Sequence, residues 1–126
     1  MIFSPSMVDV GSVSCGDSNI SILITGAGGF VGQELCQYFA KSDIDFVGVT
    51  RSPSQHYHRT VGTFCSATDW REHLKGVTTV FHLAGRAHMK DNSSEDARRE
   101  FNTINVEATK KLLVDCAVRG VKHFIY

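Results

Sequence analysis

The chain has 126 residues, of which 42% are hydrophobic and 21% charged, and this suits one globular domain with a single core. Its 13 basic and 13 acidic side chains give zero formal net charge, so the composition shows no electrostatic footprint of a protein that binds nucleic acid or an anionic membrane. The apolar stretches are strand-sized and far shorter than the roughly 20 residues that a membrane span requires.

The first third of the chain predicts a leader followed by a strand, a turn and a helix. Residues 1–18 are rich in Ser, Gly and Asp without periodicity, so we expect a flexible leader ahead of a domain at 19–126. The apolar run at 20–24 predicts a strand buried on both faces of a parallel sheet. After a glycine-rich turn, a helix is expected over 30–41. Its buried stripe is expected to comprise Val31, Leu35 and Phe39, with Gly32 and Cys36 on the same side.

The rest of the chain repeats this alternation of strand and helix. Further strands are expected at 46–49, 60–65, 77–83 and 121–126. Helices are expected from Asp69, as its N-cap, to Gly76, and from Ser93 or Ser94 to near Gly120. The alternation predicts an α/β fold, a Rossmann-type doubly wound parallel sheet of strand order 3-2-1-4-5, truncated within the fifth strand.

The strongest chemical signal is the glycine-rich turn between the first strand and the first helix. Gly26, Gly29 and Gly32 follow one another at intervals of three. Such glycines leave the backbone N–H groups at a helix N-terminus open to a pyrophosphate. The Gly-x-Gly-x-x-Gly spacing fails because Val31 occupies its sixth position, and no Lys-Ser/Thr pair of a P-loop follows. The turn therefore predicts a dinucleotide site, the alternative being a plain strand-to-helix turn that happens to be rich in glycine.

Three segments of the chain resemble the extended short-chain dehydrogenases/reductases. The run Thr25-Gly26-Ala27-Gly28-Gly29-Phe30-Val31-Gly32 is similar to the Thr-Gly-x-x-Gly-x-x-Gly signature of that family. His82-Leu83-Ala84-Gly85 resembles the cofactor-supporting Asn-Asn-Ala-Gly segment in its extended-family form. Asn105-Val106-Glu107-Ala108-Thr109 resembles the segment Asn-Val-x-Gly-Thr. The resemblance covers 20–126 and is greatest to NAD-dependent epimerase/dehydratase proteins that act on nucleotide sugars.

This resemblance implies a nucleotide-sugar epimerase, dehydratase or reductase that works by hydride transfer with NAD or NADP. The family's catalytic Ser/Thr and Tyr-x-x-x-Lys follow the fifth strand, so we expect no catalytic residue in this chain and no turnover by it alone. A homodimer is compatible with the resemblance. Two alternatives stay open, a non-enzymatic dinucleotide-sensing protein and a non-functional gene fragment. The implied cofactor contacts are Thr25, Gly26, Gly28, Gly29, Phe30, Val31, Gly32, Arg51, Leu83, Ala84 and Gly85.

The end of the second strand bears on the choice between NAD and NADP. An NAD-preferring domain usually has an acidic residue there, which binds the ribose 2′-OH. This chain has Thr50-Arg51-Ser52 instead, and Asp43 and Asp45 precede the strand. Arg51 is therefore expected to bind the 2′-phosphate of NADP, the alternative being a solvated loop cation. The acidic residue that contacts adenine in the resembling enzymes has no counterpart near Thr63.

Two polar residues fall on faces that should be buried. A buried amide must be hydrogen-bonded, or it costs about 1–3 kcal/mol. The resemblance implies that Asn105 stabilises a helix bend and supports a water of the proton relay, and a structural amide bonded to local backbone is the alternative. His82, on the fourth strand, is predicted to be a satisfied structural histidine. The core-facing stripe around Asn105 is expected to comprise Phe101, Ile104, Ala108 and Leu112.

The remaining charged and metal-binding candidates are less specific. Several cations follow the fourth strand and either steer a substrate pyrophosphate or belong to a solvated loop and helix face. The 4 cysteines and 6 histidines show no ligand spacing, so we expect no metal, and scattered thiols fit a reducing cytoplasm. The cations in question are Arg86, His88, Lys90, Arg98 and Arg99.

Overall fold

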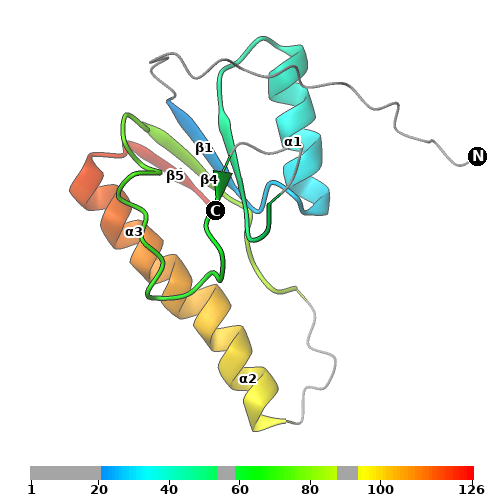
Figure 1. Ribbon diagram of the computed structural model, residues 1–126, viewed down its shortest axis with the longest axis vertical. Coiled ribbons are helices and arrows are strands. Elements are labelled where there is room, and N and C mark those ends of the chain that lie inside the picture. Colours follow the sequence, from blue (N-terminus) through cyan, green and yellow to red (C-terminus); the bar gives the residue numbers. More distant parts are fainter. Residues whose placement is uncertain (1–20, 54–58, 88–93) are drawn as a thin grey trace, which may run out of the picture.

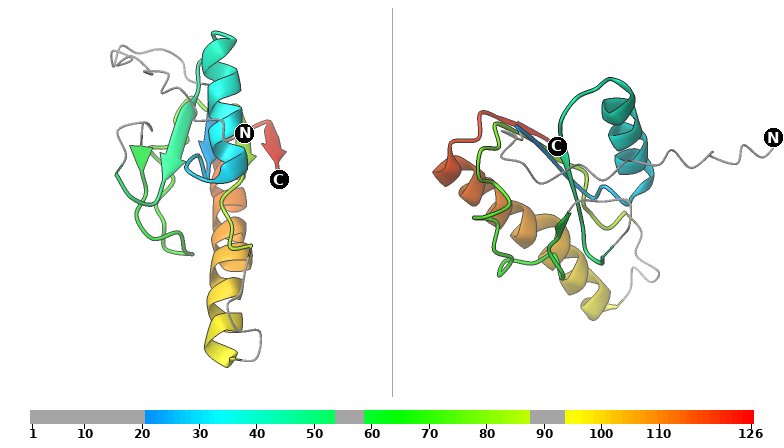
Figure 2. Two further views of the ribbon diagram at one scale, coloured as in Figure 1. Left: turned by 90° about the vertical axis from the view of Figure 1, so that its right-hand side faces the viewer. Right: turned by 45° about the horizontal axis from the view of Figure 1, so that its top comes forward.

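The computed structural model describes residues 21–53, 59–87 and 94–126, so the expected leader at 1–18 lies outside the described residues. Within these ranges the chain forms a 5-stranded parallel sheet of order β3-β2-β1-β4-β5. One helix, α1, covers one face of the sheet, and the long C-terminal helix covers the other (Figures 1 and 2). This arrangement confirms the predicted doubly wound, Rossmann-type α/β sheet.

The central strands are short and follow the predicted order. β1 (Ile22–Thr25) pairs with β2 (Val47–Thr50) on one side and with β4 (Thr79–His82) on the other. β5 (His123–Ile125) forms one edge. The predicted third strand at 60–65 is wrong in its extent, because β3 (Arg59–Thr60) ends after two residues. The chain then leaves the sheet edge, and Phe64 packs into the core instead of extending the strand.

The helix after the glycine turn has the predicted bounds, and one of its predicted contacts is wrong. α1 (Phe30–Lys41) buries Gly32, Cys36 and Phe39 against the sheet. Val31 is 61% exposed, although its spacing from Phe39 places it on the predicted stripe. Val31 lies in the first turn of α1, at the open end of the helix, whereas Gly32 packs against the backbone of the glycine turn.

The long C-terminal helix is interrupted by a π-helical segment. Ser94 caps its start by accepting a hydrogen bond from the N–H of Ala97 at 3.2 Å. Gly120 ends it in the left-handed conformation, with φ of 75°. Both ends were predicted, whereas the π-helical segment could not be read from the spacing of apolar residues. The segments are α2 (Glu95–Asn102), η1 (Thr103–Glu107) and α3 (Ala108–Arg119).

The predicted helix at 69–76 does not form. Residues 71–76 make consecutive turns, held by one helical hydrogen bond from the N–H of Leu74 to the carbonyl of Trp70 at 2.9 Å. Asp69 caps these turns as expected, because its carboxylate accepts the N–H of Arg71 at 3.1 Å. The guanidinium of Arg71 holds the pKa of the Asp69 carboxyl well below its usual range. Turns suffice here because Trp70 and Leu74 already reach the core from them.

Alternating residues of the strands supply two separate cores. Ile24 faces α1 and packs with Ala27, Cys36 and Phe39. Leu23, on the opposite face, packs with α3 and with the segment at 61–77, which covers the same side of the sheet. In the described part of the chain, no helix is both long and apolar enough to cross a membrane.

Candidate functional site

The glycine turn is closed tightly against its neighbours. Gly26 has a φ of 68°, which favours glycine, and its carbonyl accepts the N–H of Gly29 at 2.9 Å. A Cβ atom on Gly26 would lie 2.5 Å from the backbone N of Ala84. A Cβ atom on Gly32 would lie 2.9 Å from the Cα of Ala27 and would overlap the carbonyl oxygen of Gly26. The turn therefore holds β1, α1 and the loop after β4 at distances that only glycine permits.

The end of α1 that this turn creates is open. Its N-cap residue is Gly29, which provides no side-chain cap, and the first helical turn contains no acidic residue. Gly28 and Gly29 are exposed, and so are Phe30 (89%) and Val31 (61%). The first N–H groups of a helix carry partial positive charge and need an acceptor. The geometry therefore fits a phosphate or pyrophosphate group at this end of the helix.

The loop after β4 lies directly beside this turn. The N–H of Leu83 donates to the carbonyl of Thr25 at 3.2 Å, and the N–H of Ala84 donates to the Thr25 hydroxyl at 3.3 Å. Because β1 and β4 are parallel neighbours, their carboxyl ends meet at one edge of the sheet. Ligands of open α/β sheets bind at such an edge. The structure thus brings together the first and second of the three segments that the sequence singled out.

Asn105, in the third segment, is bonded to the loop that follows the carboxyl end of β4. Its Oδ1 accepts the backbone N–H of Arg86 at 2.8 Å, and its Nδ2 donates to the backbone carbonyl of Arg86 at 2.9 Å. The residue lies in the π-helical segment η1, and the helix bend that the resemblance implies stays a prediction. Its partner is backbone that lies 19 residues away in sequence, not the local backbone of the alternative reading. A Cβ atom on Gly85 would approach Asn105 Oδ1 to 3.2 Å, so Gly85 lets the amide come close.

Replacing Asn105 with leucine is expected to lower the free energy of unfolding by about 1–3 kcal/mol, because a partly buried N–H and a carbonyl of Arg86 lose their partner. Chemical denaturation measures this change. The matched control is Asn102→Leu, at an exposed position of the preceding helical turn, for which we expect a change within about 0.5 kcal/mol. An equal loss of stability in the two variants would show that the hydrogen bonds from Asn105 to the backbone of Arg86 do not stabilise the fold.

His82 is buried, with 3% of its surface exposed, and both ring nitrogens are hydrogen-bonded. Nδ1 lies 2.7 Å from the Thr25 hydroxyl, and Nε2 lies 2.9 Å from the hydroxyl of Thr109 on α3. Burial lowers the pKa of His82 to about 4, so the ring is neutral at physiological pH. The prediction that His82 is a buried histidine with its hydrogen bonds satisfied is confirmed.

His82 makes the stability of the fold depend on pH. Its folded-state pKa lies below the unfolded value, so the unfolded chain takes up a proton first as the pH falls. The free energy of unfolding is therefore expected to fall between pH 6.5 and about 4, by at most about 3 kcal/mol from this residue. Denaturation at several pH values should show a shallower fall in His82→Gln, whose amide does not titrate. A slope unchanged by this substitution would show that the fall in this pH range does not come from His82.

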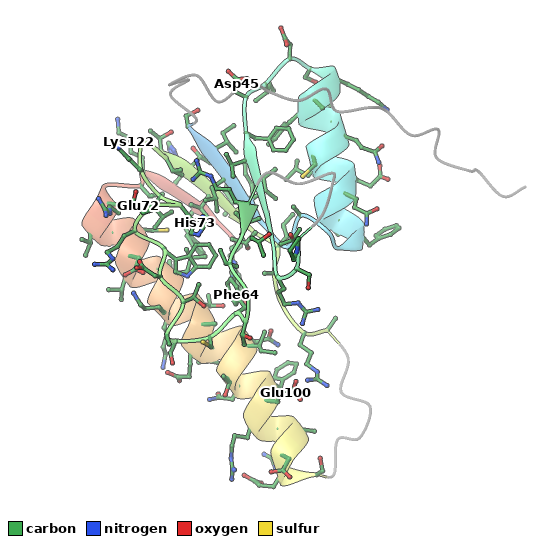
Figure 3. All side chains as sticks on the ribbon, viewed as in Figure 1. Asp45, Phe64, Glu72, His73, Glu100 and Lys122 are labelled. Atoms are coloured by element: carbon green, nitrogen blue, oxygen red, sulfur yellow. The ribbon has the colours of Figure 1, made fainter. Side chains whose placement is uncertain are left out.

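The end of β2 also reaches the glycine turn. The N–H of Ala27 donates to the carbonyl of Val49 at 3.3 Å, and exposed Arg51 follows two residues later. The hydroxyl of Thr50 donates to the carbonyl of Ser52 at 2.7 Å and shapes this bend. Figure 3 shows Asp45 at the opposite end of the sheet, which agrees with its position ahead of the strand. Arg51 is thus the charged side chain at the place where a Rossmann domain binds the ribose.

The other candidate cations are only partly described. Arg86 forms an ion pair with Glu100 of α2, while Arg98 and Arg99 are exposed. His88 and Lys90 lie outside the described residues. Among the described residues, no group of three or more His, Cys, Asp or Glu side chains is placed to hold a metal ion.

Comparison with known proteins identifies the family. Residues 22–126 match the model of the NAD dependent epimerase/dehydratase family. The chain belongs to this family. The epimerase/dehydratase family was predicted from the three segments, and its matched region contains all of them.

Relatives within and around the epimerase/dehydratase family differ in substrate. The chain is 32% identical over 114 residues to UDP-glucose 4-epimerase of Vibrio cholerae, a match covering 84% of this chain and 34% of that protein. It is 30% identical over 112 residues to 3-beta-hydroxysteroid dehydrogenase of Mycolicibacterium neoaurum, covering 83% and 31%. The solved structure of MoeE5 in complex with UDP-glucose and NAD has a TM-score of 0.69 at 28% identity, covering 82% and 34%. The chain thus spans about a third of the length of these proteins.

One participant in the site was missed by the sequence reasoning. Thr109 was quoted within its segment without a role, and the structure places its hydroxyl on His82. The available signal was its spacing, since Thr109 follows Asn105 by four residues and so faces the sheet from the next helical turn. Thr25 was predicted to contact the cofactor, but the structure buries it. Its side chain is 1% exposed, and its hydroxyl is hydrogen-bonded to the ring of His82 and to the N–H of Ala84.

Proposed function

We propose that this chain is the nicotinamide-dinucleotide-binding part of a nucleotide-sugar epimerase, dehydratase or reductase. The observation that carries the proposal is the glycine turn, closed by Gly26 and Gly32 and opening an uncapped helix beside the loop at 83–85. The similarity to a UDP-glucose 4-epimerase and to a structure holding UDP-glucose and NAD supports both the cofactor and the substrate class.

The residues of the turn have distinct parts in the proposed site. The exposed backbone at Gly28 and Gly29 and the first N–H groups of α1 bind the pyrophosphate. The side chains of Phe30 and Val31 are exposed at the same end and flank the dinucleotide. Thr25 is buried, so it holds the turn in place and makes no direct contact with the cofactor.

The loop after β4 forms the other wall of the proposed site. Leu83, Ala84 and Gly85 follow β4 beside the end of β1 and would line the dinucleotide, and Asn105 fixes the end of this loop. Because the oxygen and the nitrogen of the Asn105 amide are both bonded to the backbone of Arg86, its side chain holds this loop against the long helix. When bound, the nicotinamide supplies the acceptor and donor of a hydride. No residue of this chain is assigned as the catalytic acid or base.

The natural gene product tests the enzymatic part of the proposal. An intact mass well above 13.9 kDa in the source cells, together with NAD-dependent conversion of a UDP-sugar by that product, is the expected result. The 3β-hydroxysteroid dehydrogenase relative makes a sterol the competing substrate, to be assayed in parallel. Conversion of the sterol alone would overturn the substrate class, and a product of 13.9 kDa without turnover would overturn the enzyme assignment.

Arg51 decides the preference between the two dinucleotides in this proposal. Arg51→Ala is expected to weaken NADP binding about tenfold or more while leaving NAD binding nearly unchanged, because a guanidinium bonded to a 2′-phosphate contributes about 1.5–3 kcal/mol. Calorimetric titration of each dinucleotide measures the difference. Arg119→Ala, at the exposed far end of α3, is the matched charge control. Affinities for NAD and NADP that are equal, and that Arg51→Ala leaves unchanged, would make Arg51 a solvated loop cation.

A further inference from the structure

A continuous chain of hydrogen bonds runs from the long helix to the proposed cofactor site. The Thr109 hydroxyl on α3 meets Nε2 of His82 on β4, and Nδ1 of the same ring meets the Thr25 hydroxyl on β1. The Thr25 hydroxyl also accepts the backbone N–H of Ala84. Each of the three family segments contributes one side chain to this path. The path ends where the backbone of Ala84 touches Gly26.

The bonding pattern determines which ring nitrogen of His82 carries the proton. The Thr25 hydroxyl is buried and has one hydrogen, and one of its lone pairs already accepts the N–H of Ala84. If it donates to Nδ1, its hydrogen is satisfied and the proton of the neutral ring sits on Nε2, where Thr109 accepts it. The opposite tautomer would leave the buried Thr25 hydrogen without an acceptor among the described residues. That arrangement costs about 1–3 kcal/mol, so the Nε2–H form is favoured.

The surroundings of the ring keep it neutral and fixed. Phe64 stacks on His82 at 5.6 Å between ring centroids, and Tyr126 stacks at 6.1 Å. Phe124 of β5 adds a tilted contact at 5.6 Å. The groups that β1, α3, β5 and the segment at 61–77 present to the ring are hydroxyls and aromatic rings, and the titratable one among these contacts is the Tyr126 phenol.

We propose that His82, in its neutral Nε2–H form, is a positioning residue that transmits the position of helix α3 to the dinucleotide site. Thr109 sets the ring, the ring orients the Thr25 hydroxyl, and that hydroxyl holds the loop at Ala84 against the glycine turn. This inference rests on the proposed function, since it assigns a supporting role within that site. A purely structural histidine would stabilise the fold without affecting the affinity of the folded protein for dinucleotide.

The tautomer can be measured without a variant and without a ligand. In the ¹⁵N NMR spectrum of the chain at pH 7, the expected result is a proton on Nε2 of His82 and none on Nδ1. A proton on Nδ1 would overturn the proposed path, because Thr109 would then be the donor and the Thr25 hydrogen would be free.

The coupling is tested with three variants of the same helix, in conditions where circular dichroism shows each to be folded. Thr109→Val removes the acceptor of Nε2–H and is expected to weaken NAD binding roughly three- to tenfold and to move the backbone amide signals at 26–32 and 83–85. Thr109→Ser retains the hydroxyl and should restore wild-type affinity. Thr103→Val is the matched control, because its hydroxyl bonds to the carbonyl of Arg99 at 3.0 Å, away from His82.

The outcomes separate the two proposals. If folded Thr109→Val binds NAD as tightly as the wild type, the positioning role is wrong. If the wild type itself binds no NAD, the proposed function fails. In that case the amide signals still test the coupling, which requires Thr109→Val, and not Thr103→Val, to displace the signals at 26–32.

Discussion

Gly26→Ala is expected to lower the free energy of unfolding by about 2–5 kcal/mol and to abolish dinucleotide binding. The left-handed backbone of Gly26, with φ of 68°, costs a residue with a Cβ about 1–2 kcal/mol. The added Cβ would also lie 2.5 Å from the N and 2.6 Å from the C of the peptide unit joining Leu83 and Ala84. Overpacking of this kind typically costs a further 1–3 kcal/mol or so. The clash would push the loop at 83–85 away from the turn, so the two walls of the site would separate.

The chain contains a matched control for this substitution. Gly62 has almost the same φ, 67°, and a Cβ atom there would meet nothing within 4 Å. Gly62→Ala should therefore show the backbone cost alone, about 1–2 kcal/mol, and leave dinucleotide binding intact. Chemical denaturation and calorimetric titration of both variants measure the two quantities. Equal destabilisation by Gly26→Ala and Gly62→Ala would show that the contact of the added Cβ with the backbone of Ala84 does not reduce stability.

Trp70→Ala is expected to destabilise the chain by about 3–5 kcal/mol, which is a large part of the stability of a domain this size. Trp70 is fully buried and packs edge-on against Phe64 at 5.3 Å between ring centroids. Through this core it anchors the segment at 61–77 on the face that α3 also covers (Figure 3 shows Phe64 on this side). Its removal leaves a cavity between these elements and frees Phe64, which stacks on His82.

Trp70→Phe separates packing from the polar part of the indole. The indole N–H of Trp70 has no hydrogen-bond partner among the described residues, so phenylalanine gives up little besides volume. We expect Trp70→Phe to retain more than half of the stability that Trp70→Ala loses, as measured by thermal and chemical denaturation. A loss in Trp70→Phe as large as in Trp70→Ala would point instead to an essential role of the N–H.

The elements that could be predicted from the sequence have local causes. The bounds of α1 follow from the glycine turn before it and from the apolar spacing within it, and the long helix is marked by Ser94 and Gly120 at its ends. The parallel sheet follows from the alternation of strands and helices. The glycine turn was recognisable because Gly26, Gly29 and Gly32 stand where a strand meets a helix.

The errors arise where tertiary contacts override local patterns. Val31 fits the apolar spacing of α1, yet it is exposed at the open end of the helix while Gly32 packs against the turn. Residues 69–76 have a cap and apolar spacing, but Trp70 fills the core from a turn and no helix is required. The partner of Asn105 is backbone on another element, which no local spacing indicates.

The central claim, that the turn at 26–32 and the loop at 83–85 form a dinucleotide site, is tested most directly by NMR titration of the chain with NAD. The account predicts saturable shifts of the backbone amide signals in these two segments, with the exposed end of α3 near Arg119 unaffected. An absence of shifts at 26–32 up to millimolar NAD, or shifts confined to another part of the chain, would contradict it.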